Sequence, residues 1–265
     1  LDAMVCIGTC DKIVPGMLMA CARLGIPAVF VFGGSMLPGR YKGKIICGGA
    51  TEMIEATGAY KAGTLPHEDM EAMVENACPT PGACGAMVTG NSMGVIAEAL
   101  GMGLPGSGTA PANDFRQLRL AQHAGEAVVS LVKNGITARD IITKEAMENA
   151  IRVLCAAGGS TNCILHIIAI AREAGLDIDL DVIDELSRTT PHLAPLVPSG
   201  PYSVPDFFEA GGVAGVMKRL EGAINLDCIT VTGATVGENL KSARVLDDEI
   251  IRPLDSPYKP EGGIA

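Results

Sequence analysis

A strand, helix, strand pattern occupies the first 34 residues and constrains the fold more than any other feature of this chain. Two apolar segments, DAMVCIG (2–8) and IPAVFVFGG (26–34), are rich in β-branched residues and end at glycine, which is typical of buried parallel strands. Between them, VPGMLMACARLG (14–25) predicts a helix with Pro15 in its first turn and Gly25 at its end. The right-handed crossover that such a unit makes brings both strands into one parallel sheet.

The rest of the chain alternates helical patterns with glycine-rich loops. Aromatic residues make up only 3% of the sequence, so the core must be built from small and aliphatic side chains, a composition that suits helices on a sheet. We therefore predict an α/β fold, a parallel sheet layered with helices in a Rossmann-like three-layer domain. A proline-dense stretch near 190–205 suggests a main domain at 1–190 and a continuation or subdomain at 191–265. Helices are expected at 51–61, 67–77, 91–100, 114–133, 143–156, 160–174, 181–187 and 212–220, and an extended segment at 228–233.

Charge and cysteine usage narrow the possible partners and the compartment. The formal charge of −10 offers nothing to nucleic acid or to anionic membranes, and prolines and glycines interrupt the apolar stretch 24–39, so no membrane-spanning helix is expected. Nine cysteines without a C-x-x-C motif or a secretory signal indicate reduced thiols and a cytoplasmic protein. An organellar location stays open, because we expect the natural N-terminus to lie upstream of Leu1.

Cys10, Asp11 and Lys12 follow the first predicted strand directly, at the end of a parallel strand where ligands gather. Side chains diverge in such a loop, so a soft thiolate can face one inorganic centre while a hard carboxylate faces another. The alternative is a buried cysteine followed by an exposed Asp-Lys pair, and the tripeptide alone favours that alternative.

Cys84 lies between two glycines in a loop that opens a helix. Its sulfur would be accessible there and assisted by backbone N–H groups, as a cluster ligand requires. The alternative, equally favoured by the sequence, is that the flanking glycines permit a tight turn around a core cysteine. The glycine loops contain neither a G-x-G-x-x-G motif after a strand nor a Walker lysine pattern, which argues against a nucleotide site.

Four long segments together resemble the dihydroxy-acid dehydratase and sugar-acid dehydratase family, which includes 6-phosphogluconate dehydratase. They run in order along the chain: CDKIVPGMLMACARLGIPAVFVFGGSMLPG, GACGAMVTGNSMGVIAEALGMGLPGS, AAGGSTNCILHIIAIAREAG and LAPLVPSGPYSVPDFFEAGGVAGVMKRL. The resemblance implies a [2Fe–2S] or [4Fe–4S] cluster held by three cysteines, with Mg²⁺ beside it. By motif match, Cys10 and Cys84 are cluster ligands, Asp11 is a magnesium ligand, and Lys12 is a catalytic lysine that ligates the metal once carbamylated.

The same resemblance implies a hydro-lyase that converts a 2,3-dihydroxy carboxylic acid into a 2-oxo acid, with branched-chain amino-acid biosynthesis as the favoured context. A sugar-acid or 6-phosphogluconate substrate is the alternative, because the sequence departs from the usual pattern at Ser35, Ala86, Gly90 and Ser92. Family members are about twice this length, so we expect the third cysteine, the base and a β-rich C-terminal domain to lie outside this chain. A non-catalytic binding or oligomerisation module is therefore a further alternative. The family also implies a homodimer.

The remaining polar candidates have plainer explanations. In GGSTN (158–162), Ser160 or Thr161 would cap a long apolar helix, although the free N–H groups there could instead receive a carboxylate. Cys163 and His166 are three residues apart on that helix and could bind a metal, but the surrounding isoleucine and leucine favour a satisfied core histidine. We expect the other three histidines, His67, His123 and His192, on the surface.

Overall fold

A parallel pair of strands forms the edge of the main body in this computed structural model, which describes residues 1–48 and 52–264. β1 (Met4–Gly8) pairs with β2 (Ala28–Phe32), Met4 lying opposite Ala28 and Gly8 opposite Phe32. The connecting helix α1 (Ile13–Leu24) ends at Gly25, whose left-handed φ of 60° needs no side chain. The unit expected from the first 34 residues is confirmed.

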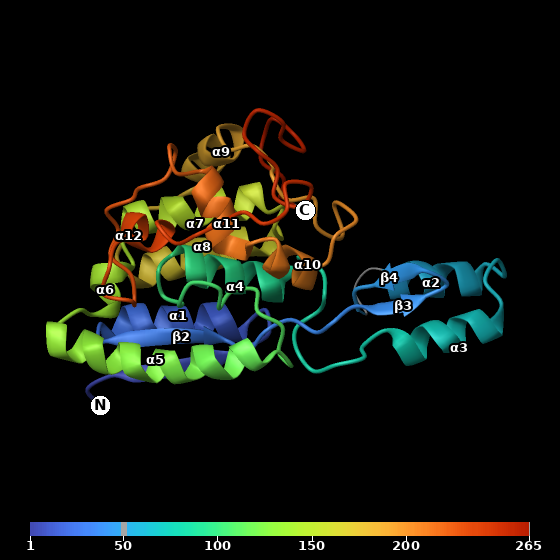
Figure 1. Ribbon diagram of the computed structural model, residues 1–265, viewed down its shortest axis with the longest axis horizontal. Helices are drawn as coiled ribbons and strands as arrows, with labels where there is room; N and C mark the ends of the chain where they lie inside the picture. The colour runs from blue at the N-terminus through green and yellow to red at the C-terminus, as the bar shows by residue number, and fades with distance from the viewer. Residues whose placement is uncertain (49–51, 265) are drawn as a thin grey trace.

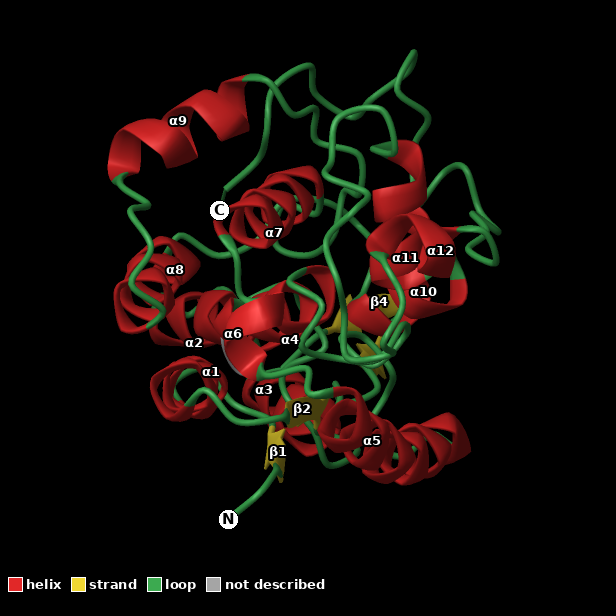
Figure 2. Cartoon of the chain, turned by 90° about the vertical axis from the view of Figure 1, so that its left-hand side faces the viewer, coloured by secondary structure: helices red, strands yellow, loops and turns green. Residues whose placement is uncertain are grey.

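Helices cover both sides of these two strands. α5 (Phe115–Asn134) packs against both strands. α1 also contacts both strands, and α4 (Thr89–Ala99) contacts β2. Viewed along the strands, α1 and α5 lie on either side of them (Figure 2). The fold is thus mixed α/β with a small parallel sheet, which confirms the broad class.

α4 is the central helix of the body, and every one of its residues is buried. Around it pack α1, α8 (Asn162–Glu173) and the helices at 144–156 and 212–219. In Figure 1, α4 lies between α1 below and α8 above. Segments before and after residue 190 contribute side chains to this one core. The division into 1–190 and 191–265 stays a prediction. The other helices of the body are α6 (Ala138–Ile141), α7 (Lys144–Ala156), α9 (Leu180–Arg188), α10 (Val204–Glu209), α11 (Gly212–Arg219) and α12 (Val236–Leu240).

The long helices agree with the sequence-based expectations to within about two residues, as their periodicity and caps allow. Three short helices, α6, α10 and α12, were not expected. Each begins with a capping box, Thr137 with Asp140, Ser203 with Asp206, and Thr235 with Glu238, a signal that was present in the sequence. The segment 228–233 is not a strand: Thr230 Oγ1 donates to the Ala234 carbonyl and folds the chain into a turn.

A small lobe projects from the body and was not expected as a separate unit (Figure 1). It contains the hairpin β3 (Gly39–Tyr41) and β4 (Lys44–Ile46) and two helices, α2 (Glu52–Lys61) and α3 (His67–Asn76). Lys42 and Gly43 make the hairpin turn with φ values of 46° and 79°. Positive φ at both turn residues matches the twist of a two-residue hairpin.

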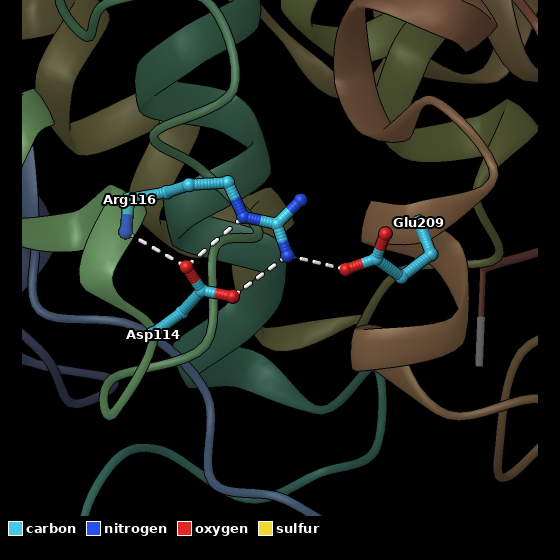
Figure 3. Close-up of polar contacts among 3 residues, drawn as sticks. All are labelled: Asp114, Arg116 and Glu209. Carbon is cyan, nitrogen blue, oxygen red and sulfur yellow. Dashed lines mark hydrogen bonds and ion pairs between the residues drawn. The ribbon is translucent and has the colours of Figure 1, made fainter.

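An ion cluster joins α5 to α10 on the surface of the body (Figure 3). Arg116 Nε and Nη2 donate to the two carboxylate oxygens of Asp114 at 2.9 and 2.7 Å, and Nη2 also donates to Glu209. The guanidinium lies 4.4 Å from the centre of the Phe208 ring.

Within the part of the chain described, no helix combines the length and the apolarity needed to span a membrane.

Candidate functional site

The loop Thr9–Lys12 joins the end of β1 to the start of α1. The Cys10 carbonyl accepts the first two N–H groups of α1, from Ile13 at 3.1 Å and Val14 at 3.3 Å, so the loop has a defined geometry. The Cys10 thiol is exposed. Lys12 Nζ donates to Asp11 Oδ2 over 3.0 Å, and these side chains are 70% and 38% exposed. All three predicted functional groups are therefore accessible to a ligand.

Glycine keeps this loop close to the sheet. A Cβ at Gly33 would lie 2.0 Å from Thr9 Oγ1, so any side chain at this position after β2 would displace Thr9. The backbone continues the parallel pairing here, because Gly33 N–H donates to the Gly8 carbonyl at 2.8 Å. The loop thus begins at a fixed point on the sheet.

Cys84 lies in a second loop, between the small lobe and α4. Ala83 forms a parallel bridge to Ser35, and Gly85 N–H donates to the Cys47 carbonyl at 2.8 Å. At Gly82, φ is +127° and a Cβ would lie 2.5 Å from Met36 N, so this glycine is required by the close approach of two backbones. The Cys84 side chain is half-buried.

Asn91 fixes the same loop from the first turn of α4. Its amide donates to the carbonyls of Ala86, at 2.7 Å, and of Cys84, and the side chain is fully buried. Sequence analysis did not single out Asn91. The available signal was an asparagine at the start of an otherwise apolar predicted helix, because an amide that such a helix buries must find hydrogen-bond partners.

The two loops meet at Gly90. A Cβ at this position would contact the Thr9 carbonyl and Ala83 at 3.4 Å, and the Asp11 nitrogen at 3.8 Å. Burial is the main reason why the pKa of Cys84 is raised, and the neighbouring Cys10 and Cys78 thiols raise it further. The structure therefore brings the Cys10 loop and the Cys84 loop together, and the roles of the two thiols stay a prediction.

The Cys47 thiol also lies near Cys84. A Cβ at Gly48 would lie 3.6 Å from Cys84 Sγ, and the adjacent Cys47 is fully buried. Burial raises the pKa of Cys47 to about 12, with additional effects from Glu52, Asp206 and Cys84. Among residues 1–48 and 52–264, however, no three Cys, His, Asp or Glu side chains converge as a metal site would require.

The start of α8 lies beside this site and is tied to α4 by hydroxyl groups. Thr89 Oγ1 and Ser160 Oγ are 3.0 Å apart, and Asn162 Nδ2 donates to Thr89 Oγ1 at 2.9 Å. Thr161 occupies the N-cap position without a side-chain cap, whereas Ser160 Oγ accepts from Asn162 N–H at 3.3 Å. The carbonyls of Ser160 and Thr161 accept the next two N–H groups. These internal partners favour capping over carboxylate binding.

Cys163 and His166 behave differently from each other. Cys163 is fully buried, and this burial raises its pKa to about 12. His166 is half-buried, its pKa is lowered by burial and by nearby Lys12, and its Nε2 has no hydrogen-bond partner in the described chain. The expectation that His166 is a satisfied core histidine is therefore wrong.

The expectation that His192 lies on the surface was also wrong. His67 and His123 are exposed, but His192 is only 1% exposed. Its Nε2 is 2.9 Å from the Ala194 carbonyl, and its ring packs edge-on against Tyr258. The C-terminal segment covers this ring, and a contact so distant in sequence left no local signal.

Comparison with known proteins identifies the family. The model "Dihydroxy-acid/6-phosphogluconate dehydratase N-terminal" matches residues 1–239. The dihydroxy-acid dehydratases of Pyrococcus furiosus and Agathobacter rectalis are each 51% identical to this chain, covering 99% and 100% of it and 48% and 47% of those enzymes. That of Caldicellulosiruptor saccharolyticus is 50% identical over 99% of the chain and 48% of the enzyme. The chain belongs to the dihydroxy-acid/6-phosphogluconate dehydratase family and spans about half the length of these curated relatives.

Proposed function

We propose that this chain forms the cluster-binding part of a dehydratase that removes water from a 2,3-dihydroxy carboxylic acid and yields a 2-oxo acid. The observation that carries the proposal is the packing of Gly90 against both Thr9 and Ala83, which brings the Cys10 and Cys84 loops into contact. The names of the relatives support the same reaction class.

Cys10 and Cys84 would hold an iron–sulfur cluster, either [2Fe–2S] or [4Fe–4S], and Asp11 and Lys12 would hold Mg²⁺. The donor atoms suit these groups, because thiolate sulfur prefers iron and carboxylate oxygen prefers magnesium. Both thiols are at least partly accessible, and the Asp11 side chain, next to Cys10 in the chain, is 38% exposed. The other ligands would come from the part of the relatives that this chain does not span. When bound, these groups would supply Lewis acids for the departing hydroxyl and for the substrate carboxylate.

Lys12 would act as a ligand only after modification. A neutral lysine amine adds carbon dioxide and loses one proton, and the resulting carbamate offers hard oxygen donors. The 70% exposure of the Lys12 side chain leaves its Nζ open to this reaction, and the Asp11 carboxylate 3.0 Å away keeps it at the site. Asn91 would position Cys84 through the two carbonyls that it holds.

The cluster proposal is tested on a full-length protein that contains this chain, purified without oxygen. We expect visible absorbance together with iron and acid-labile sulfide, and we expect Cys84→Ser to abolish all three. Cys163→Ser is the matched control, because Cys163 is fully buried on α8 and should leave them intact. A colourless wild-type protein without iron would instead support the non-catalytic module.

A branched 2,3-dihydroxy acid is the substrate we favour, as in branched-chain amino-acid biosynthesis, because the relatives carry the dihydroxy-acid dehydratase name. The family description also contains 6-phosphogluconate dehydratase, so sugar acids are the second candidate. Anaerobic assay of 2-oxo acid formation from both substrate classes separates them. Equal or faster turnover of aldonates would overturn the first choice.

We also propose a homodimer. Apolar side chains of Val5 and Ile7 on β1, and of Phe115 and Leu118 on α5, are between 38% and 70% exposed. These exposures support our choice of β1 and α5 as the contact surface. Sedimentation velocity of the full-length protein should show a dimer that Leu118→Glu weakens. Leu246→Glu, at a 70% exposed loop position, is the control. A Leu118→Glu protein that remains dimeric would exclude this surface as the interface.

The remaining assignments are consistent with this function. Nine free cysteines fit a reducing compartment, and we propose the cytoplasm. We further propose that β1 and β2 belong to a larger Rossmann-like three-layer sheet in the full-length protein, because helices already cover both sides of the pair.

A further inference from the structure

Two cysteines outside the proposed site face each other between β1 and α1. Cys6 Sγ and Cys21 Sγ are 3.8 Å apart, within hydrogen-bond distance for sulfur. Cys6 is half-buried on the strand, whereas Cys21 is completely buried on the helix. Among the described residues, this is the one hydrogen bond found between two cysteine sulfurs.

We propose that Cys6 and Cys21 form an oxidation site, at which a hydroperoxide closes a disulfide between β1 and α1. A disulfide has an S–S length of about 2.05 Å, so the sulfur atoms must approach by about 1.8 Å. Rotation of the two side chains supplies part of this movement. The proposal is independent of the dehydratase function, since neither thiol belongs to the ligand set.

The environment of the two sulfurs gives them different roles. The hydrogen bond with Cys21 is the main cause that lowers the pKa of Cys6 to about 7, against the opposing effect of burial. The same bond and burial raise the pKa of Cys21. Either sulfur can donate the S–H in this contact, and exposure separates the two roles. Cys6, which solvent reaches, is the nucleophile, and Cys21 is the resolving thiol.

The reaction balances with one hydroperoxide per disulfide. The Cys6 thiolate attacks the terminal peroxide oxygen, the O–O bond breaks, and the leaving oxygen takes a proton to become water or an alcohol. The Cys21 sulfur then attacks the sulfenic acid of Cys6. The S–O bond breaks, and hydroxide leaves as water with the proton of Cys21. The two thiols lose two electrons, which the peroxide gains.

The position of the pair gives the modification a local consequence. The two cysteines are 15 residues apart, and the loop Thr9–Lys12 lies between them. A disulfide would therefore join the strand that enters the loop to the helix that leaves it. This restricts relative movement of β1 and α1, while the exposed Cys10 thiol is not consumed.

The test uses the reduced 265-residue chain treated with hydrogen peroxide, quenched with N-ethylmaleimide and digested with trypsin. Cleavage after Lys12 and Arg23 separates the two cysteines, so we expect peptides 1–12 and 13–23 joined with loss of two hydrogen atoms. Cys10 shares the first peptide, and the experiment is repeated in Cys10→Ser to assign the link to Cys6. Cys163→Ser is a control that should retain the link.

Single variants test the roles. Cys21→Ser should leave a sulfenic acid on Cys6 that dimedone traps, and Cys6→Ser should leave Cys21 unoxidised. Circular dichroism establishes that each variant is folded. If both thiols of the folded wild-type chain still react with maleimide after peroxide treatment and denaturation, the proposal is overturned. A link from Cys21 to Cys10 instead of Cys6 would overturn it as well.

Discussion

Glu98 is a buried carboxyl group whose ionisation should make the stability of this protein depend on pH. It lies on α4 and is 7% exposed, and its two oxygens accept N–H bonds from Gly106 at 2.8 Å and Gly108 at 2.7 Å. Burial raises the pKa of Glu98 from 4.5 to about 7, although the two N–H bonds act in the opposite direction. The carboxyl group thus binds its proton more tightly in the folded chain than in the unfolded chain.

The sign of the effect follows from this difference. Stability from the neutral form is fully present below the unfolded pKa of 4.5 and is lost as the pH rises through the folded pKa of about 7. A difference of roughly 2.5 pKa units corresponds to about 3 kcal/mol of unfolding free energy. We expect this loss between about pH 4.5 and pH 7, with little further change above that range.

Glu98→Gln removes the ionisation and keeps the shape. At pH 5 both side chains are neutral, so the two proteins should differ by only about 1 kcal/mol, the worth of one altered hydrogen bond. By pH 8 the variant should gain about 3 kcal/mol relative to wild type. Urea unfolding monitored by circular dichroism at several pH values measures both curves. The exposed Glu126 on α5 supplies the control, Glu126→Gln, which should show no such divergence.

The outcome distinguishes burial from hydrogen bonding. Parallel stability curves for wild type and Glu98→Gln between pH 5 and pH 8 would refute the reasoning. A variant that becomes less stable than wild type as the pH rises would show that the Gly106 and Gly108 N–H bonds outweigh the cost of burying the charge.

Three further predictions concern packing around the site and the surface. Asn91→Leu should lower the unfolding free energy by about 2 kcal/mol, because the carbonyls of Cys84 and Ala86 lose their donor. Urea unfolding measures this loss, and an unchanged free energy would show that the two hydrogen bonds do not stabilise the fold. Gly33→Ala should cost about 2 kcal/mol, because the new methyl group meets Thr9. Adding Thr9→Ala should recover about 1 kcal/mol, and strict additivity in this double-mutant cycle would contradict the contact. Arg116→Met should cost no more than about 1 kcal/mol, and the difference should shrink in high salt, because its side chain is 42% exposed. A salt-independent loss would indicate that packing on Phe208 matters more.

The sequence by itself determined the local elements and the chemistry of the loops. Pro15 lies in the first turn of α1 and Gly25 follows its last residue, so both ends of this helix were recognisable. The apolar runs before and after it form β1 and β2, and the hydrophobic periodicity indicated long helices such as α5. These features depend on neighbours in the chain, so they can be recognised in one dimension. The residues Cys10 to Lys12 at the end of β1 were recognisable for the same reason.

Only the tertiary structure decided which distant groups meet. Three features depend on the packing of separate segments: the contact of Gly90 with both site loops, the hydrogen bond from Asn91 to the Cys84 carbonyl, and the burial of His192. The pairing of Cys6 with Cys21 likewise depends on how α1 lies on β1. A periodicity shows which face of an element is apolar, but not which partner covers that face. For this reason the sequence supplied the reactive groups, whereas the arrangement that brings them together came from the fold.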